Sequence, residues 1–199
     1  MATTFQSDVA SAIIDSVGGG FVESVELAGS FGSGGGGCNT GEIIVNSKSY
    51  FYKQGGIQDY DMLRAEYEGN KEIDDTNTIR VPKPIAIGTS DYSSYAVFER
   101  LELGGPGDPS RYAKDLAAMH RCSSAGKGYG WRMNNTCGVT PQINTWEMSW
   151  ADFWCKHRLG QIMSLSKREG ASFDNEKEIL AKTHEMLSFH EREHNLQPR

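Results

Sequence analysis

Cysteine and basic residues are both in short supply in this chain. Only four cysteines occur among 199 residues, and no two of them form a C-x-x-C pair, which argues against a disulfide framework and against a thiolate metal site. The 20 Lys and Arg residues are outnumbered by 26 Asp and Glu residues, which gives a formal net charge of −6. Such a chain offers no basic field to a phosphate backbone, so nucleic acid is not an expected partner.

Long apolar runs are also absent. No segment reaches the roughly 20 apolar residues that a membrane-spanning helix needs. Residues 1–15 carry acidic side chains and no continuous apolar stretch, unlike a secretory signal or a transit peptide. We therefore expect no membrane partner and a reducing, cytoplasmic location, with an organellar address left open if residues precede Met1. The content of 38% hydrophobic and 23% charged residues is typical of a globular protein.

The first half of the chain shows mainly β patterning after one helix. That helix is predicted at 3–17, because Thr3 and Gln6 fit a capping box and apolar residues recur along one face. A second helix is predicted at 59–73. Alternating or β-rich stretches bounded by turn residues predict the strands. The predicted strands lie at 21–27, within 42–53 as a hairpin, at 81–88 and at 93–103.

The pattern of the sequence changes from strand-like to helical after a Gly- and Pro-containing tract that begins at Gly104. Beyond it, helical runs are predicted near 110–122, 149–168 and 173–193, with an irregular Gly- and Asn-containing segment between the first two. We therefore expect an α+β fold. Its predicted parts are a β-rich front part at 1–103 and a mostly helical part at 104–199.

The glycine tract between the first strands suggests a phosphate-binding loop. Gly32–Gly37 satisfies G-x-G-x-x-G, a pattern shared by dinucleotide-binding folds and kinase glycine loops. A dinucleotide site requires a helix directly after the glycines, but residues 42–53 are strand-like, which disfavours NAD. A kinase instead holds phosphates with a lysine on the next strand, oriented by a helix glutamate, and Lys53 and Glu66 stand in that order. A flexible glycine turn with Lys53 as a solvated charge is the alternative that these residues leave open.

Several further motifs follow one another in a fixed order along the chain. The most specific stretch contains Asn134-Asn-Thr-Cys-Gly138 and Thr140-Pro-Gln-Ile-Asn-Thr-Trp146, and earlier stretches include Met62-Leu-Arg-Ala-Glu-Tyr-Glu-Gly69 and Leu116-Ala-Ala-Met-His120. Together they resemble the fructosamine-3-kinase and protein-ribulosamine 3-kinase family, which belongs with the aminoglycoside and choline kinase-like folds. The resemblance spans almost the whole chain. It implies a protein-kinase-like fold with a β-rich N-lobe and an incomplete, mostly helical C-lobe.

The same resemblance implies a set of nucleotide-binding residues. Lys53 resembles the phosphate-binding lysine and Glu66 its ion-pair partner, with Glu68 a weaker substitute. The segment Val97-Phe-Glu-Arg-Leu101 resembles the hinge, whose backbone N–H and C=O groups bond the adenine edge. The implied nucleotide-binding residues are Gly34, Gly35, Gly36, Gly37, Lys53, Glu66, Glu99, Arg100 and Leu101.

Family members phosphorylate the sugar 3-hydroxyl of ketosamines, such as ribulosamine or fructosamine attached to protein lysines, and the adduct then decomposes. The resemblance therefore implies ATP-dependent ketosamine phosphorylation that leads to protein deglycation. ATP and Mg²⁺ are the implied cofactors, and glycated lysine side chains of proteins or small ketosamines are the implied partners.

The groups that perform phosphoryl transfer are not found within this sequence. The reaction needs a carboxylate to orient the attacking hydroxyl and ligands for Mg²⁺, and the family motif His-Gly-Asp-Leu-Trp does not occur in the 199 residues. The resemblance places it downstream of Arg199. We therefore expect the chain alone to be a truncated, inactive kinase with apolar helix faces left exposed. The alternative is a non-catalytic nucleotide-binding or dimerisation module from a short gene product.

Two other patterns carry competing interpretations. His190-Glu-Arg-Glu-His194 matches the zinc motif H-E-x-x-H, but its polar surroundings favour a solvated helix end, so no metal site is expected. Cys38 lies beside the glycine loop, where backbone N–H groups can activate a thiolate. A redox role with a homodimer linked through Cys38 stands beside the alternative of a small residue tolerated in a tight loop.

Overall fold

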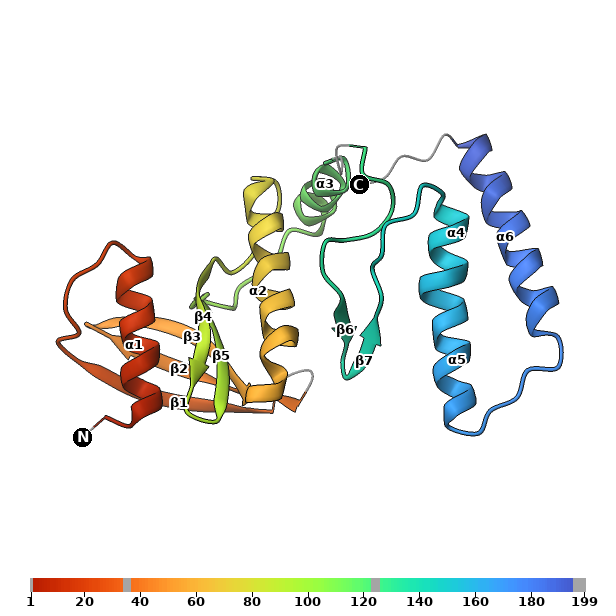
Figure 1. Cartoon of the computed structure of the whole chain (residues 1–199). Helices are drawn as coiled ribbons and strands as arrows, with labels where there is room; N and C mark the ends of the chain where they lie inside the picture. The colour runs from red at the N-terminus through yellow and green to blue at the C-terminus, as the bar shows by residue number, and fades with distance from the viewer. Residues whose placement is uncertain (1, 34–36, 123–125, 195–199) are drawn as a thin grey trace. The chain divides into compact units, whose positions relative to one another are not determined.

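The computed structural model describes residues 2–33, 37–122 and 126–194 (Figure 1). Its contacts divide the chain into two compact units, Met1–Met119 and His120–Arg199, and each unit is described here by itself. Helix α3 (Pro109–His120) belongs almost entirely to the first unit. The division between lobes at Gly104 stays a prediction.

Five antiparallel strands form the sheet of the first unit, in the order β1-β2-β3-β5-β4. The hairpin predicted within 42–53 is present. Its turn residues Asn46 and Ser47 have φ angles of 48° and 66°, as a two-residue turn that matches the strand twist requires. The strands are β1 (Val25–Ser33), β2 (Asn39–Val45), β3 (Lys48–Gly56), β4 (Pro84–Ser90) and β5 (Ser93–Glu99).

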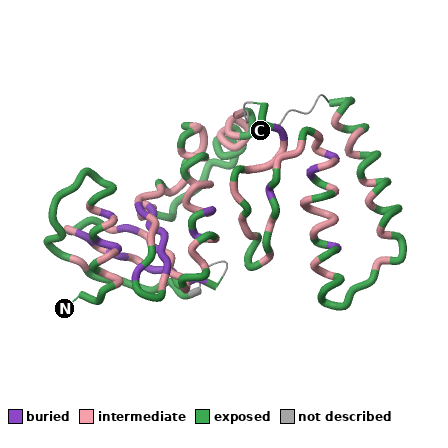
Figure 2. The backbone as a smooth tube through the Cα atoms, viewed as in Figure 1, coloured by how far each residue is buried: buried purple, intermediate pink, exposed green. Residues whose placement is uncertain are grey.

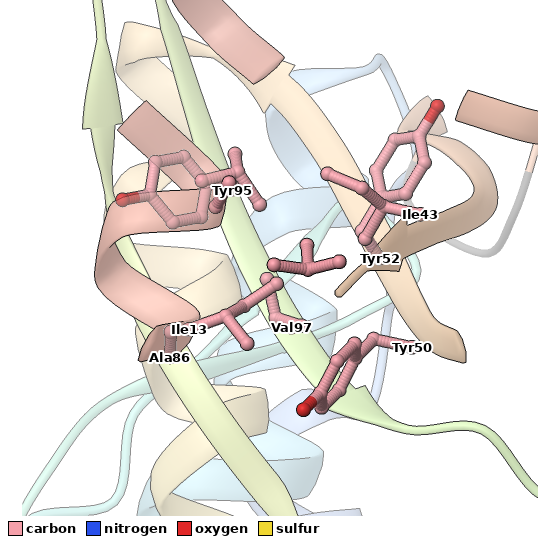
Figure 3. Close-up of a cluster of buried hydrophobic side chains, with 10 residues drawn as sticks. Ile13, Ile43, Tyr50, Tyr52, Ala86, Tyr95 and Val97 are labelled. Carbon is pink, nitrogen blue, oxygen red and sulfur yellow. The ribbon is translucent and has the colours of Figure 1, made fainter. Parts of the chain in front are cut away.

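Helix α1 (Thr4–Ser16) packs on one face of this sheet, and the capping box predicted at its start is confirmed. Thr3 Oγ1 accepts the Gln6 backbone N–H at 3.3 Å, and Gln6 Oε1 accepts the Thr3 N–H at 2.7 Å. The buried side of α1 joins tyrosines and aliphatic residues of the strands in one core cluster (Figure 3). This cluster holds the β2–β3 hairpin in place on the α1 face of the sheet.

Helix α2 (Tyr60–Asp75) covers the opposite face of the sheet. Successive residues of a strand point to opposite sides, so each strand supplies side chains to both faces. Along β3 and β5, Tyr52 and Val97 belong to the cluster under α1, whereas Phe51 and Phe98 pack with Leu63 of α2 in a second cluster. Many of the buried residues of this unit accordingly lie in the strands of the sheet (Figure 2). Lys53 lies two residues after Phe51, so it shares the α2 face.

The second unit contains a short hairpin and a run of helices. The helix predicted at 149–168 is present but not uniform, because a π-helical segment interrupts it. Arg158 lies in this segment and donates to Asn144 Oδ1 at 2.6 Å and to the Ile143 carbonyl at 2.8 Å, which ties the helix to the segment after the hairpin. The elements are β6 (Asn135–Cys137), β7 (Thr140–Gln142), α4 (Trp150–Trp154), the π-helical η3 (Cys155–Leu159), α5 (Gly160–Arg168) and α6 (Glu176–Glu193).

Helix α6 has apolar side chains on its outer side. Ile179, Met186 and Phe189 are 41%, 64% and 59% exposed, which agrees with the expectation of exposed apolar positions on the later helices. Within the described residues, no helix combines the length and apolar character needed to cross a membrane.

Candidate functional site

The predicted lysine and glutamate meet on the α2 face of the sheet. Lys53 lies on the inner strand β3, opposite Thr40 of β2 and Ala96 of β5. Its Nζ lies 2.6 Å from Glu66 Oε1, and the two side chains are 18% and 37% exposed. The residue that contacts Lys53 is Glu66 rather than Glu68. A mostly buried ammonium needs such a counter-charge, so the pair holds one cation at a fixed place on the sheet.

The glycine tract follows directly from the edge strand β1. Register shifts between Leu27 and Gly29 and between Ser30 and Gly32 interrupt its pairing with β2, and such bulges bend a strand. Thr40 Oγ1 donates to the Gly32 carbonyl at 3.1 Å, which fixes the end of the bent segment beside Lys53. Gly37 has a φ of 82°, a conformation that favours glycine. The predicted Gly34, Gly35 and Gly36 lie outside the described residues.

The predicted hinge residues Glu99, Arg100 and Leu101 lie at the end of β5 and just beyond it. Glu99 is directed toward the segment before β4, where Arg80 donates to its Oε1 at 2.6 Å and the Lys83 N–H donates to Oε2 at 3.3 Å. The hydrogen bond from Arg80 holds the pKa of Glu99 below its ordinary value, against partial burial. The Leu101 carbonyl accepts a hydrogen bond from Arg100 Nη1. The Glu99 backbone N–H also donates to the Lys83 carbonyl at 2.8 Å, so the side chain and the backbone of Glu99 both hold this segment against the one before β4.

Four side chains outside the predicted site residues lie on the same face. Glu42 of β2 stands opposite Phe51 of β3, which in turn stands opposite Phe98 of β5. Phe31 of β1 stacks on Phe51, with ring centroids 6.2 Å apart and planes 16° from parallel. The alternation of β2 and β3 was the available signal, because it places Glu42, Phe51 and Lys53 on one side.

Cys38 is buried rather than accessible. Its side chain is 1% exposed and packs with Leu63 and Phe98. Burial raises the pKa of the Cys38 thiol, the Asp59 carboxylate raises it further, and the Lys53 ammonium lowers it by less. Thiolate is the reactive form, so this placement differs from the activated thiol considered from the sequence. A disulfide through Cys38 stays a prediction and would require the residue to become exposed.

The glutamate of the H-E-x-x-H pattern is Glu191 of α6, and it makes hydrogen bonds to the start of α4. Glu191 accepts the Ser149 hydroxyl at 3.0 Å and the Trp150 backbone N–H at 3.1 Å, so it caps the first turn of α4. The His190 and His194 rings lie with centroids 4.2 Å apart. In the described part of the chain, no three or more His, Cys, Asp or Glu side chains gather where they could hold a metal ion.

Similarity to known proteins runs along nearly the whole chain. The fructosamine kinase family model matches residues 20–198. A "probable ketoamine kinase" from Synechocystis sp. is 39% identical over 156 residues, covering 76% of this chain and 52% of the relative. The chloroplastic protein-ribulosamine 3-kinase of Oryza sativa subsp. japonica is 38% identical over 160 residues, covering 77% and 47%. The chain therefore spans about half the length of these curated relatives.

Solved structures agree on the fold. The crystal structure of a "putative fructosamine-3-kinase" from Haemophilus somnus superposes with a TM-score of 0.76 at 24% identity, over 90% of this chain and 60% of that one. A second such protein, from Thermobifida fusca, gives a TM-score of 0.61 at 19% identity. An antiparallel five-stranded sheet with helices on both faces, matched in this way, defines a kinase-like α+β fold. The chain itself belongs to the fructosamine kinase family.

Proposed function

We propose that this chain supplies the nucleotide-binding half of an ATP-dependent ketosamine kinase, which phosphorylates the 3-hydroxyl of ribulosamine or fructosamine and so promotes protein deglycation. The observation that carries the proposal is the Lys53–Glu66 ion pair of 2.6 Å on the sheet face beside the glycine tract. A positioned lysine and a glycine-rich hairpin are the parts with which kinases hold nucleotide phosphates. The two plant and cyanobacterial relatives described above, named as ribulosamine and ketoamine kinases, support the substrate class.

ATP fits the residues of the first unit. Lys53 presents an ammonium for the phosphates, and the bent end of β1 is held beside Thr40, the residue that stands opposite Lys53. The backbone of Glu99 to Leu101 would bond the base, which leaves its side chains free to make other contacts. Glu66 would hold Lys53 in position rather than touch the nucleotide. When bound, ATP supplies the phosphoryl group for transfer.

The described residues do not form a comparable site for Mg²⁺. No cluster of potential metal ligands occurs within residues 2–33, 37–122 and 126–194, so no step is assigned to a metal held by this chain. Its ligands would have to come from other residues of the complete kinase.

Two aspartates considered as a catalytic base, Asp108 and Asp152, make other contacts in the structure. Asp108 Oδ1 accepts the N–H groups of Ser110 and Arg111 at the start of α3, and Asp152 pairs with Lys156 at 3.7 Å. We therefore propose that the 199-residue chain binds nucleotide but does not turn over alone. The second candidate, a non-catalytic nucleotide-binding or dimerisation module, rests on the same site.

A chimera separates these two functions. Residues 20–198 would replace the matching part of the rice protein-ribulosamine 3-kinase, and ADP release would be measured with a ribulosamine-modified lysine peptide. The proposal predicts turnover by the chimera and its loss by at least about 100-fold with Lys53→Met, as expected when a positioned charge at the transferring phosphates is removed. Lys48→Met, on the same strand with its Nζ near the Tyr50 ring, is the control and should retain activity. A folded chimera that binds ADP without turnover would favour the binding module.

A further inference from the structure

The side chain of Arg100 reaches from the hinge segment to Phe31 of β1 and toward Glu42 of β2. Its guanidinium carbon lies 5.4 Å from the centroid of the Phe31 ring, and Phe31 in turn stacks on Phe51. These three side chains, called here the Arg100 stack, join the hinge segment to the edge strand that leads into the glycine tract. They lie on the same side of the sheet as the Lys53–Glu66 pair.

The polar contacts of Arg100 leave one of its hydrogen-bond donors without a partner. Its Nη1 donates to the Leu101 carbonyl at 2.5 Å, and its Nε lies 3.8 Å from Glu42 Oε1, a separation too long for a hydrogen bond. That Nε is buried and has no hydrogen-bond partner. A buried donor without a partner is unfavourable, so moving this side chain outward would regain hydration for one donor while giving up one hydrogen bond and the ring contact.

Arg100 therefore uses two features that a nucleotide base would also use. A hinge carbonyl accepts the exocyclic amino group of a purine, and an aromatic face provides the surface on which a planar base stacks. In the structure Arg100 donates to the Leu101 carbonyl and lies over the Phe31 ring. Both features are thus engaged by one side chain of the chain itself.

We propose that Arg100 is a specificity-determining latch that competes with the purine base for the Leu101 carbonyl and the Phe31 ring. The inference rests on the proposed nucleotide site and adds a side-chain role to a segment expected to act through its backbone. The base binds when Arg100 moves away from Phe31, and Glu42 offers the nearest carboxylate for its displaced guanidinium. The latch penalises ligands that lack an amino donor or a stacking surface, because they cannot replace the contacts that Arg100 gives up.

The test is isothermal titration calorimetry of the whole chain with adenosine, inosine, ADP and inorganic pyrophosphate. In Arg100→Met the side-chain stem stays but the charge and donors are lost. Removing the competing hydrogen bond and cation–π contact should tighten adenosine and ADP binding by about three- to tenfold and leave pyrophosphate binding unchanged. Inosine, which has a carbonyl in place of the amino group, must displace the same Arg100 contacts and should gain by a similar factor while still binding more weakly than adenosine. Arg111→Met removes the same charge from an arginine that is 80% exposed on α3, and it should change none of these affinities.

Other outcomes separate the latch from the site itself. Suppose that ADP binding depends on Lys53, but that the adenosine affinity of Arg100→Met is equal to or lower than that of the wild type. The latch is then refuted and the nucleotide site stands. If the wild type binds neither ADP nor adenosine, the proposed function fails and the latch fails with it. Should Arg100→Met not fold, Arg100→Lys keeps the charge but loses the planar fork. That variant is then expected to tighten adenosine binding, and an unchanged affinity would again refute the latch.

Discussion

The ion pair between Lys53 and Glu66 gives a sharp prediction about stability, because its two members differ in exposure. Lys53 is 18% exposed and Glu66 is 37% exposed. Changing Glu66→Gln leaves a largely buried ammonium without its counter-charge. Changing Lys53→Met leaves a carboxylate that can still reach water and replaces the lysine stem with an apolar one. The two substitutions should therefore be unequal, with Glu66→Gln the more damaging.

The expected loss in the free energy of unfolding lies between the values for exposed and for buried ion pairs. Exposed pairs contribute about 0.2–1 kcal/mol, and breaking a fully buried pair costs about 3–5 kcal/mol. For this partly exposed pair we expect Glu66→Gln to lower the free energy of unfolding by about 1–2 kcal/mol and Lys53→Met by less than about 1 kcal/mol. The double variant should be more stable than the sum of the single changes predicts, with a coupling energy of about 1 kcal/mol.

The assay is urea unfolding followed by far-UV circular dichroism for the wild type, both single variants and the double variant. All four tryptophans belong to residues 120–199, so tryptophan fluorescence follows the second unit and serves as an internal control. A coupling energy within about 0.3 kcal/mol of zero, the usual error of additivity, would refute the ion pair as a structural element. Equal losses for the two single variants would refute the argument from unequal exposure.

Three further predictions concern other parts of the chain. Iodoacetamide should alkylate buried Cys38 far more slowly than exposed Cys137, because burial raises the pKa of the Cys38 thiol; mass spectrometry of digested samples checks this, and equal rates would contradict the buried placement. Glu99 has a lowered pKa, so its pair with Arg80 stabilises above the ordinary glutamate pKa of about 4.3 and is lost as the pH falls through the lower folded-state pKa. The Tm difference between wild type and Arg80→Met should therefore shrink in melts below that pH, and a constant difference would count against the pair. Asn144→Ala removes a 4% exposed side chain that joins several hydrogen bonds, and it should destabilise the second unit by about 2–4 kcal/mol in fluorescence-monitored unfolding; a loss below about 0.5 kcal/mol would show that the network is not needed.

Much of the first unit could be predicted from local patterns. The capping box at Thr3, the polar turn at Asn46 and the helix that begins near Tyr60 each rest on short-range chemistry, and the structure has all three. The order of Lys53 and Glu66 along the chain also suggested that they meet. In each case the signal lies within a few residues or within one repeating pattern, which a single sequence reveals.

The rest depends on contacts between distant residues. Strand order brings Glu42, Phe51 and Arg100 to one face, although Arg100 is separated from the other two by about half of the first unit. Burial of Cys38 under α2 could not be seen either, because neighbouring glycines suggested an open loop. The π-helical segment at Cys155–Leu159 has no composition that marks it. Arg158 in this segment donates to Asn144, which is a tertiary contact that local patterns do not reveal.

The central claim is that the first unit binds nucleotide phosphates through Lys53, and calorimetric titration of the 199-residue chain with ADP tests it most directly. We expect ADP to bind the wild type and the Lys48→Met control alike, and Lys53→Met to bind about 10- to 100-fold more weakly, since a charge-assisted hydrogen bond to phosphate contributes about 1.5–3 kcal/mol. Adenosine, which has no phosphate, should bind all three equally. Undiminished ADP binding by a folded Lys53→Met chain would contradict the account.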